Sequence, residues 1–530
     1  MPVLWMSSPP SNLDQPLQSP PSVREHLSAF SLIFVALFLS HGALLRLPYF
    51  WDEAGYYIPA ARDLLITGDL IPHSTLSNAH PPLLAIYLAT WWKLSGFTPA
   101  VTRIALLIVT SFSLLGLWRL ASVVANRTVA VIAVLCTAAF PVFFAQSSLA
   151  HLDMLVTAFT IWGVAFYLEG RNVRAVIMFA FAGLSKETAI LTPGVLIAWE
   201  VFAPARWRTG PRNWKRAVRL LLSFVPLAIW FLYLHHRTGF YTGDPYYYSY
   251  NVGATLTPLR IVLAIVLRLW HTLGYMNLFV LTLLTLAAML EPAVVDGTAA
   301  RRRIALPVQM VLYAVIAAHV VSLAIAGGAV LARYMLPVYP LIVLVCVSTL
   351  YRRLRWWPVA TAVVVASFLA GLVFNPPYRF APEDNLTYRD YILLHRGAAT
   401  YLSQHAHGAH VLTAWPASDE ISRPFLGYLK EPIPVVRIEN FTAAQMTLAA
   451  AAQGQYDWVY LFSTKYEPPH LLIHSAYWEG MQKRFFDYHI DISPEVAARM
   501  VGGRIVYQSH RRGEWVALVQ IEHAENARLR

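Results

Sequence analysis

The sequence predicts a mainly helical membrane domain of about eleven spans with additional interfacial helices, followed by a smaller α/β domain outside the membrane. Hydrophobic residues make up 57% of the 530 residues, charged residues only 13%, and the mean hydropathy is +0.49. Apolar runs of span length recur up to about residue 374, and the composition beyond residue 375 is that of a soluble domain. We therefore expect a multi-pass protein of the lipid bilayer.

Residues 1–25 are rich in Pro, Ser and Gln and predict a disordered cytoplasmic tail. They lack the basic, apolar and small-residue regions of a secretory signal peptide. The first apolar run, from about His26 to Leu47, is long enough to span and delivers Asp52 and Glu53 to the opposite face. Because charge near hydrocarbon is costly, these carboxylates either cap a helix exposed to water or belong to a working site.

Two amphipathic segments after the first span are expected to lie in the membrane interface. Residues 54–65 place apolar side chains at helical spacing, with Arg62 and Asp63 on the polar side. After a polar loop, His80-Pro81-Pro82 begins the second segment, because proline is favoured in the first turn of a helix.

Ten further apolar runs bring the expected number of spans to eleven. They fall near residues 103–119, 128–145, 152–168, 174–185, 188–203, 217–236, 273–290, 304–327, 334–350 and 357–374. The runs at 174–185 and 188–203 are short, so a kinked hairpin or one long span there would change the number. These runs define a membrane domain over residues 26–375.

Lys and Arg are concentrated in alternate loops, which predicts the orientation in the membrane. The basic loops hold Arg119 and Arg127; Arg171 and Arg174; Arg206, Arg208, Arg212, Lys215, Arg216 and Arg219; Arg301, Arg302 and Arg303; and Arg352, Arg353 and Arg355. Lys93 and Arg103 are exceptions on the outer side. The net charge of +12 is therefore a topology signal rather than a nucleic-acid footprint. We expect a cytoplasmic amino terminus in an inner (plasma) membrane.

Residues 376–530 predict a soluble α/β domain, with Pro376-Pro377 marking its boundary. A helical pattern covers about 386–404, and strand-like runs follow at 410–414, 458–462, 504–507 and 516–521. Span parity places this domain on the extracytoplasmic side, together with Asp52. The two cysteines, Cys136 and Cys346, lie inside apolar runs and suggest neither a disulfide nor a CxxC metal site.

Several ionisable residues map to outer ends of spans or to outer loops, which suggests a single site. They are Asp52, Glu53, His80, His151, Asp153, Lys186, Glu187, Asp244, His271 and Arg333. Carboxylates beside cations at a lipid surface fit a reaction between an anchored anionic lipid donor and a polar acceptor.

Five short motifs in this set carry a family resemblance. They are Asp52-Glu53, His80-Pro81-Pro82-Leu83-Leu84, Asp153-Met154-Leu155, Gly183-Leu184-Ser185-Lys186-Glu187 and Arg333-Tyr334-Met335-Leu336-Pro337. In their order and common side, the motifs resemble those of GT-C glycosyltransferases. Within that class the chain is similar to protein O-mannosyltransferases and lipid A aminoarabinose transferases, over roughly residues 28–375.

The resemblance implies an inverting transfer of a sugar from a polyprenyl-phosphate donor to a hydroxyl of a protein, lipid or glycan acceptor. Asp52 matches the catalytic base, which takes the proton of the attacking hydroxyl, and Asp153 matches the second acidic position. Arg333 and then Lys186 are the first choices for the phosphate, since a guanidinium holds two oxygens and an ammonium acts as a point charge. Three further residues complete the expected binding set: His80, Tyr334 and His271. Glu53 is assigned to the catalytic group as an orienting neighbour of Asp52.

One departure from the family concerns metal binding. Family members place an acidic residue just before the Pro-Pro pair, in one subgroup as a metal ligand, whereas Ser77-Asn78-Ala79-His80 has none. His80 and His271 remain available as ligands, yet Mg²⁺ prefers oxygen. The sequence therefore identifies no certain cofactor, and a divalent metal at these histidines stays open as the less favoured alternative.

Other interpretations stay open for the same residues and for the whole chain. Asp52 and Asp153 could cap helices, Lys186 and Glu187 could neutralise each other, and Arg333 could be a membrane-surface anchor. A transporter is a competing function, although the charges cluster at one surface rather than at the midplane. A binding protein with a degenerate catalytic site is a third.

Overall fold

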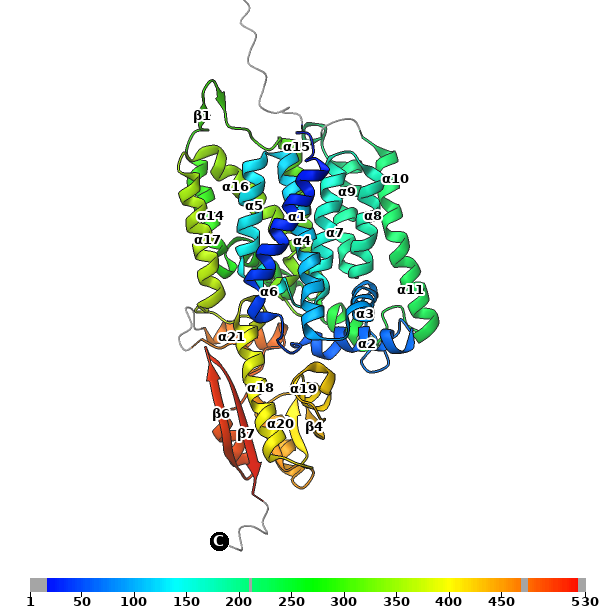
Figure 1. The fold of residues 1–530 in the computed structure, drawn as a ribbon, viewed down its shortest axis with the longest axis vertical. Helices are drawn as coiled ribbons and strands as arrows, with labels where there is room; N and C mark the ends of the chain where they lie inside the picture. The colour runs from blue at the N-terminus through cyan, green and yellow to red at the C-terminus, as the bar shows by residue number, and fades with distance from the viewer. Residues whose placement is uncertain (1–16, 209–211, 469–474, 523–530) are drawn as a thin grey trace, which may run out of the picture.

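The computed structural model describes residues 17–208, 212–468 and 475–522. Most of the predicted tail, residues 1–16, lies outside the described residues. Helix α1 (Val23–Ser40) is N-capped by Ser22, whose side chain forms a capping box with Glu25. Figure 1 shows a bundle of helices with a small sheet-containing part below one end of it, and the chain enters the bundle at the opposite end.

The bundle contains the helices of the predicted membrane domain. In order they are α1, α2 (Ile58–Thr67), α3 (Leu83–Ser95), α4 (Pro99–Val124), α5 (Arg127–Ala139), α6 (Pro141–Gln146), α7 (Leu152–Leu168), α8 (Asn172–Ser185), α9 (Leu191–Phe202), α10 (Trp214–Leu221), α11 (Val225–Thr238), α12 (Pro245–Asn251), α13 (Pro258–Leu273), α14 (Leu278–Met289), α15 (Leu306–Ile325), α16 (Tyr339–Arg353) and α17 (Trp357–Val373). A two-stranded hairpin, β1 (Val295–Asp296) with β2 (Ala299–Ala300), follows α14. Helices α4 and α7 pack against each other at the centre.

The predicted number of eleven spans is not confirmed. Among the described residues, five helical segments are long and apolar enough to cross a membrane, at 23–40, 99–124, 214–238, 258–289 and 306–325. Four shorter apolar helices, α5, α7, α8 and α17, accompany them. The expected run at 128–145 is divided because Pro141 cannot continue the ladder of backbone hydrogen bonds, so α6 begins there.

Helix α13 lies outside the predicted spans. The predicted run in this region, 273–290, begins where α13 ends. Met276 and Asn277 adopt left-handed backbone angles, with φ of 47° and 67°, and separate α13 from α14 by a sharp kink. The Asn277 side chain donates a hydrogen bond to the carbonyl oxygen of Ser367 at 2.8 Å, which ties the kink to α17. Arg268 is buried in the bundle on α13 and is not among the residues that the sequence predicts for the site.

The C-terminal part consists of α18 (Thr387–His405) and the elements after it. Its sheet has the order β4-β3-β5-β7-β6. The strands are β3 (Val411–Ala414), β4 (Val435–Ile438), β5 (Trp458–Phe462), β6 (Gly503–Arg511) and β7 (Glu514–Ile521). Three of them, β4, β3 and β5, are parallel, and β7 and β6 are antiparallel. Four helices complete it: α19 (Ala417–Ser422), α20 (Ala443–Ala451), α21 (Ala476–Phe485) and α22 (Pro494–Met500).

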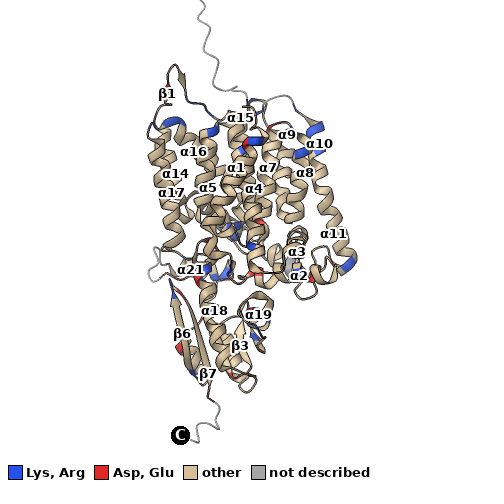
Figure 2. Ribbon diagram, viewed as in Figure 1, with Lys and Arg blue, Asp and Glu red and all other residues tan. Residues whose placement is uncertain are grey.

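Charged side chains are distributed unevenly along the bundle. Figure 2 shows Lys and Arg at the helix ends farthest from the C-terminal part, for example at α10 and near the β1 hairpin. A second group of acidic and basic side chains lies at the other end, where the bundle meets the C-terminal part. The candidate site is built from this second group.

Candidate active site

Asp52 lies in a turn that the C-terminal part holds in place. It precedes the π-helix η2 (Glu53–Tyr57), which continues into α2. Trp51 has a left-handed φ of 45°, an uncommon conformation for a large side chain. Its ring contacts those of Tyr391 and Trp415, with centroids 5.6 and 5.4 Å away. Packing against α18 and the residue after β3 therefore supports a strained backbone directly before Asp52.

Arg333 is the centre of a cluster of charged side chains that includes Asp52, Asp153 and Glu383. It lies in the 3₁₀-helix η8 (Ala332–Met335), with 2% of its side chain exposed. Its Nη2 forms an ion pair with Asp52. Nη1 lies 3.2 Å from Glu383 Oε2, and Nε lies 3.7 Å from Asp153 Oδ2. One guanidinium thus gathers carboxylates from three separate parts of the chain.

Lys186 extends this cluster toward Tyr334. Asp153, in the first turn of α7, accepts a hydrogen bond from Lys186 Nζ through Oδ1 at 2.8 Å. The same ammonium lies 3.9 Å from the centre of the Tyr334 ring, which is a cation–π contact. Both partners of the ion pair are buried. The structure therefore brings together Asp52, Asp153, Lys186, Arg333 and Tyr334, all of which the sequence analysis selected.

His80 and Glu187 form a neighbouring pair. His80 Nδ1 is 2.8 Å from Glu187 Oε2, and although burial opposes ionisation, the nearby His80 lowers the pKa of Glu187 to about 2. Tyr57 lies between this pair and the cluster, with its ring centroid 6.3 Å from that of His80 and 6.0 Å from that of His151. A pocket between α2, α3 and α11 is lined by His80, Tyr57 and Trp230, among others. The pocket lies beside the cluster and is lined mainly by apolar and aromatic side chains.

The capping and anchoring interpretations do not fit these contacts. Asp52 makes no side-chain capping hydrogen bond, and the helix of Asp153 has no side-chain cap. Lys186 and Glu187 bind different partners, Asp153 and His80, and Arg333 is buried rather than extended to a membrane surface.

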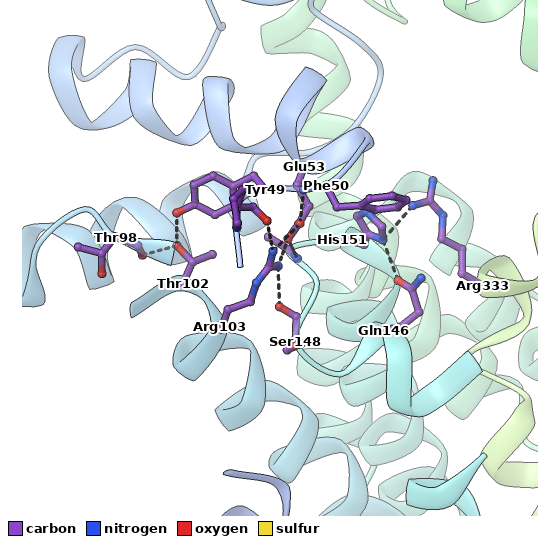
Figure 3. A network of polar contacts seen from close by, with 12 residues as sticks. Tyr49, Phe50, Glu53, Thr98, Thr102, Arg103, Gln146, Ser148, His151 and Arg333 are labelled. Atoms are coloured by element: carbon purple, nitrogen blue, oxygen red, sulfur yellow. Dashed lines mark hydrogen bonds and ion pairs between the residues drawn. The ribbon is translucent and has the colours of Figure 1, made fainter. Parts of the chain in front are cut away.

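Glu53 belongs to a different, fully buried ion pair. Figure 3 shows its carboxylate against the guanidinium of Arg103 on α4. Glu53 also accepts hydrogen bonds from the backbone N–H groups of Phe50, at 2.9 Å, and Ala150, at 2.5 Å. This network joins the turn before Asp52 to the segment before α7. It also explains why Arg103 stands on the side of the bundle where basic residues are otherwise few.

His151 and Gln146 link the cluster to the loop after α17. His151 Nδ1 lies 2.9 Å from Arg333 Nη1 and 2.7 Å from Gln146 Oε1 (Figure 3). Burial and the charge of Arg333 lower the pKa of His151 well below its usual range, so the imidazole is neutral. Gln146 and Glu383 were not selected from the sequence. The signal for Glu383 was a second acidic pair, Glu383-Asp384, just after the last predicted span.

Arg268 and His271 lie one helical turn apart on α13. Arg268 is buried and donates through Nη1 to the Leu331 carbonyl oxygen at 2.5 Å, while Nε and Nη2 have no hydrogen-bond partner within the described ranges. Its Cζ lies 5.6 Å from the centre of the Tyr334 ring. His271 packs against Tyr275 at 4.8 Å between centroids. Three cations, Lys186, Arg268 and Arg333, therefore surround one tyrosine.

The described residues, 17–208, 212–468 and 475–522, contain no group of three or more His, Cys, Asp or Glu placed to hold a metal ion. His80 contacts Glu187, and His271 contacts Tyr275, so the two histidines considered as ligands have different surroundings.

Comparisons with known proteins agree with this architecture. A family model described as dolichyl-phosphate-mannose-protein mannosyltransferase matches residues 79–232, which include His80, Asp153 and Lys186. The crystal structure of ArnT from Cupriavidus metallidurans bound to undecaprenyl phosphate matches with a TM-score of 0.54 and 14% identity, over 94% of this chain and 98% of that chain. The chain has the fold of a GT-C glycosyltransferase.

The GT-C fold is supported by two further structures. ArnT from the same organism in the apo state has a TM-score of 0.52 and 15% identity, over 93% of this chain and 98% of that one. The Archaeoglobus fulgidus oligosaccharyltransferase in complex with zinc and sulfate has a TM-score of 0.50 and 13% identity, over 82% of this chain and 67% of that chain. No curated protein sequence matches the chain. The predicted resemblance to GT-C glycosyltransferases is confirmed, for a multi-pass membrane protein.

Proposed function

We propose that the protein is an integral membrane glycosyltransferase that moves a sugar from a polyprenyl-phosphate donor to a hydroxyl acceptor, with Asp52 as the general base. The family model and the GT-C fold support the reaction class. ArnT was crystallised with undecaprenyl phosphate, which supports a lipid-phosphate donor here.

The exposure of Asp52 carries the assignment of the base. Its side chain is 18% exposed, whereas Asp153 and Glu383, the other carboxylates on Arg333, are each 5% exposed. An alcohol becomes a competent nucleophile when a base within hydrogen-bond reach takes its proton in the transition state. Asp52 is the carboxylate of this cluster that a hydroxyl reaches first. Attack on the anomeric carbon then breaks the bond to the lipid phosphate in one displacement, which inverts that carbon.

The leaving lipid phosphate gains negative charge and needs nearby cations. Arg333, first choice from the sequence, already binds Asp52 and Glu383, so we assign it chiefly to orienting the base. Two nitrogens of Arg268, Nε and Nη2, have no hydrogen-bond partner among the described residues. Arg268 and Lys186 both lie against the ring of Tyr334. We therefore assign the phosphate to Arg268 and Lys186, with His80, Tyr334 and His271 around it.

Charge distribution supports an orientation in the membrane. The basic helix ends lie opposite the site (Figure 2), and basic loops favour the cytoplasmic side. We propose that the site and residues 376–530 face the outside of an inner (plasma) membrane. The acceptor is then a protein, lipid or glycan of the cell envelope.

Transfer by purified protein tests the proposed function. The protein in lipid nanodiscs receives radiolabelled undecaprenyl-phosphate mannose, glucose or aminoarabinose, together with envelope extract as acceptor. We expect label in the acceptor from at least one donor. A transporter would instead move labelled donor across proteoliposomes without transfer, and a degenerate binding protein would bind undecaprenyl phosphate and do neither.

Arg268→Gln is expected to raise the donor KM by about ten- to a hundredfold, because a charge-assisted hydrogen bond contributes about 1.5–3 kcal/mol. Arg260→Gln is the matched control. Arg260 is also buried on α13, but it donates to the carbonyl oxygens of Gly327 and Gly328. Initial rates over a range of donor concentrations measure the effect. A donor KM within twofold of wild type in Arg268→Gln would remove Arg268 from the phosphate site.

A further inference from the structure

Glu383 brings the junction between the bundle and the C-terminal part into the cluster. It lies in the 3₁₀-helix η9 (Pro382–Asp384), between α17 and α18. Its carboxylate is 3.2 Å from Arg333, and its backbone carbonyl oxygen accepts a hydrogen bond from Gln146 Nε2 at 3.1 Å. The loop is thus anchored to α6, and Glu383 contacts the same guanidinium as Asp52 although 331 positions separate the two residues in the sequence.

The surroundings of Glu383 contain more carboxyl groups than cations. The groups around it are Arg333, Asp52, Asp153, Asp384, the neutral His151, and Tyr275, which donates to Asp384 at 2.5 Å. Lys186 is engaged by Asp153. Burial raises the pKa of Glu383 to about 8, against the attraction of Arg333, and burial raises that of Asp384 to about 7. Protonation of Glu383 or Asp384 removes the repulsion between neighbouring carboxylates, and near neutral pH it costs little free energy because both pKa values are raised.

We propose that Glu383 is a positioning residue, which holds Arg333 against Asp52 and does so as a neutral carboxylic acid while the anionic donor is bound. The proposal rests on the proposed function. Oε2 of a neutral acid still accepts the Arg333 N–H. The other oxygen, Oε1, is buried without a hydrogen-bond partner in the part of the chain that the structure describes, so a proton there displaces no bond.

An ionised Glu383 would weaken both the orientation of Asp52 by Arg333 and the binding of the anionic donor. Its charge competes with Asp52 for Arg333, which loosens the orientation of the base. It also adds a negative charge beside the three cations around Tyr334, where we place the phosphodiester of the donor. Donor affinity is therefore expected to fall as the pH rises through the pKa of Glu383, since neutral Glu383 predominates below that pKa.

Donor KM and kcat, measured between about pH 6 and about pH 9, test this role. A sugar phosphodiester does not titrate in this range. With a pKa of about 8 for Glu383, the wild-type donor KM is expected to rise about tenfold between about pH 7 and about pH 9. Glu383→Gln, which is neutral at every pH, flattens this rise. Glu383→Ala, which releases Arg333, lowers kcat by about tenfold or more and loses more activity than Glu383→Gln.

Two controls separate this role from a general loss of structure. Asp384→Asn removes the adjacent carboxyl, which binds Tyr275 instead of Arg333, and keeps a rise in KM, shifted to lower pH because Asp384 helps to raise the pKa of Glu383. Glu467→Gln alters an exposed carboxylate near Arg379 and changes neither constant. A rise in KM in Glu383→Gln that equals the wild-type rise overturns the proposal, and so does a wild-type kcat in Glu383→Ala.

Binding of donor without turnover distinguishes this proposal from the proposed function. If no donor is turned over, equilibrium binding of undecaprenyl-phosphate mannose to the whole protein replaces KM in the same pH series. Weaker binding above about pH 8 in wild type, but not in Glu383→Gln, then supports the role of Glu383 although transfer has failed. Equal pH dependence in the two proteins overturns it.

Discussion

Asp52→Asn is expected to lower the rate of sugar transfer by about a hundredfold to ten-thousandfold, the usual contribution of a general base. An amide has nearly the shape of a carboxylate and accepts a hydrogen bond from Arg333, yet it does not take a proton from the acceptor. Glu383 continues to hold Arg333 in the variant. Expression and donor binding should therefore remain close to wild type, and kcat alone should fall.

The matched control for this substitution is Asp69→Asn. Asp69 lies just after α2 and, like Asp52, pairs with an arginine, but its partner Arg237 is exposed and the pair lies outside the cluster. Initial rates of labelled-sugar transfer and binding of undecaprenyl phosphate should be measured for both variants. Transfer by Asp52→Asn within fivefold of wild type would show that another group removes the proton.

The helices and strands that the sequence predicts best are those that local pattern determines. The apolar run at 152–168 matches α7, and the run at 458–462 matches β5, because each is uniform and ends at polar or turn residues. The kink at Met276 and Asn277 depends instead on a contact with α17, which has no local signature. Helix α13 does not match an uninterrupted apolar run because Arg260, Arg268 and His271 interrupt its apolar residues. The number of spans therefore cannot be derived from apolar runs alone.

The residues of the candidate site that the sequence predicts are charged residues beside the hydrocarbon region, where an unpaired charge is unfavourable. Asp52, Asp153, Lys186 and Arg333 stand at the ends of apolar runs, where an unpaired charge would be costly, so each needed a partner. Their partners were not predictable. Arg333 draws together segments that are hundreds of residues apart, and Glu383 lies beyond the predicted domain boundary at residue 376. A boundary drawn from composition assigned Glu383 to the soluble domain, whereas its side chain completes a membrane-side cluster.

The different roles of the adjacent residues Asp52 and Glu53 follow from the same geometry. The sequence predicts both as catalytic residues. Glu53 is fully buried, and its carboxylate is engaged by Arg103 and two backbone N–H groups. We therefore propose that Glu53 acts only by fixing the turn that presents Asp52.

Arg103→Ala is expected to destabilise the protein by about 3–5 kcal/mol, because it leaves the carboxylate of Glu53 buried without a counter-ion. Arg103 is 1% exposed and also donates to the carbonyl oxygens of Pro48, at 3.1 Å, and Ser148, at 2.9 Å. Loss of the guanidinium thus releases the segments on both sides of the turn. Unfolding in detergent and the yield of monodisperse protein measure the effect. Arg237→Ala, at the exposed pair with Asp69, should leave the unfolding midpoint unchanged.

The double variant Glu53→Met with Arg103→Met tests whether Glu53 has a catalytic role of its own. Replacing both partners of a buried ion pair by apolar side chains of similar volume is often neutral, whereas removal of one partner is not. We expect the double variant to recover most of the stability that Arg103→Ala loses, and to recover transfer with it, because Asp52 and Arg333 are intact. A stable double variant without transfer would show that Glu53 takes part in the chemistry, and that the turn holds two working carboxylates instead of one.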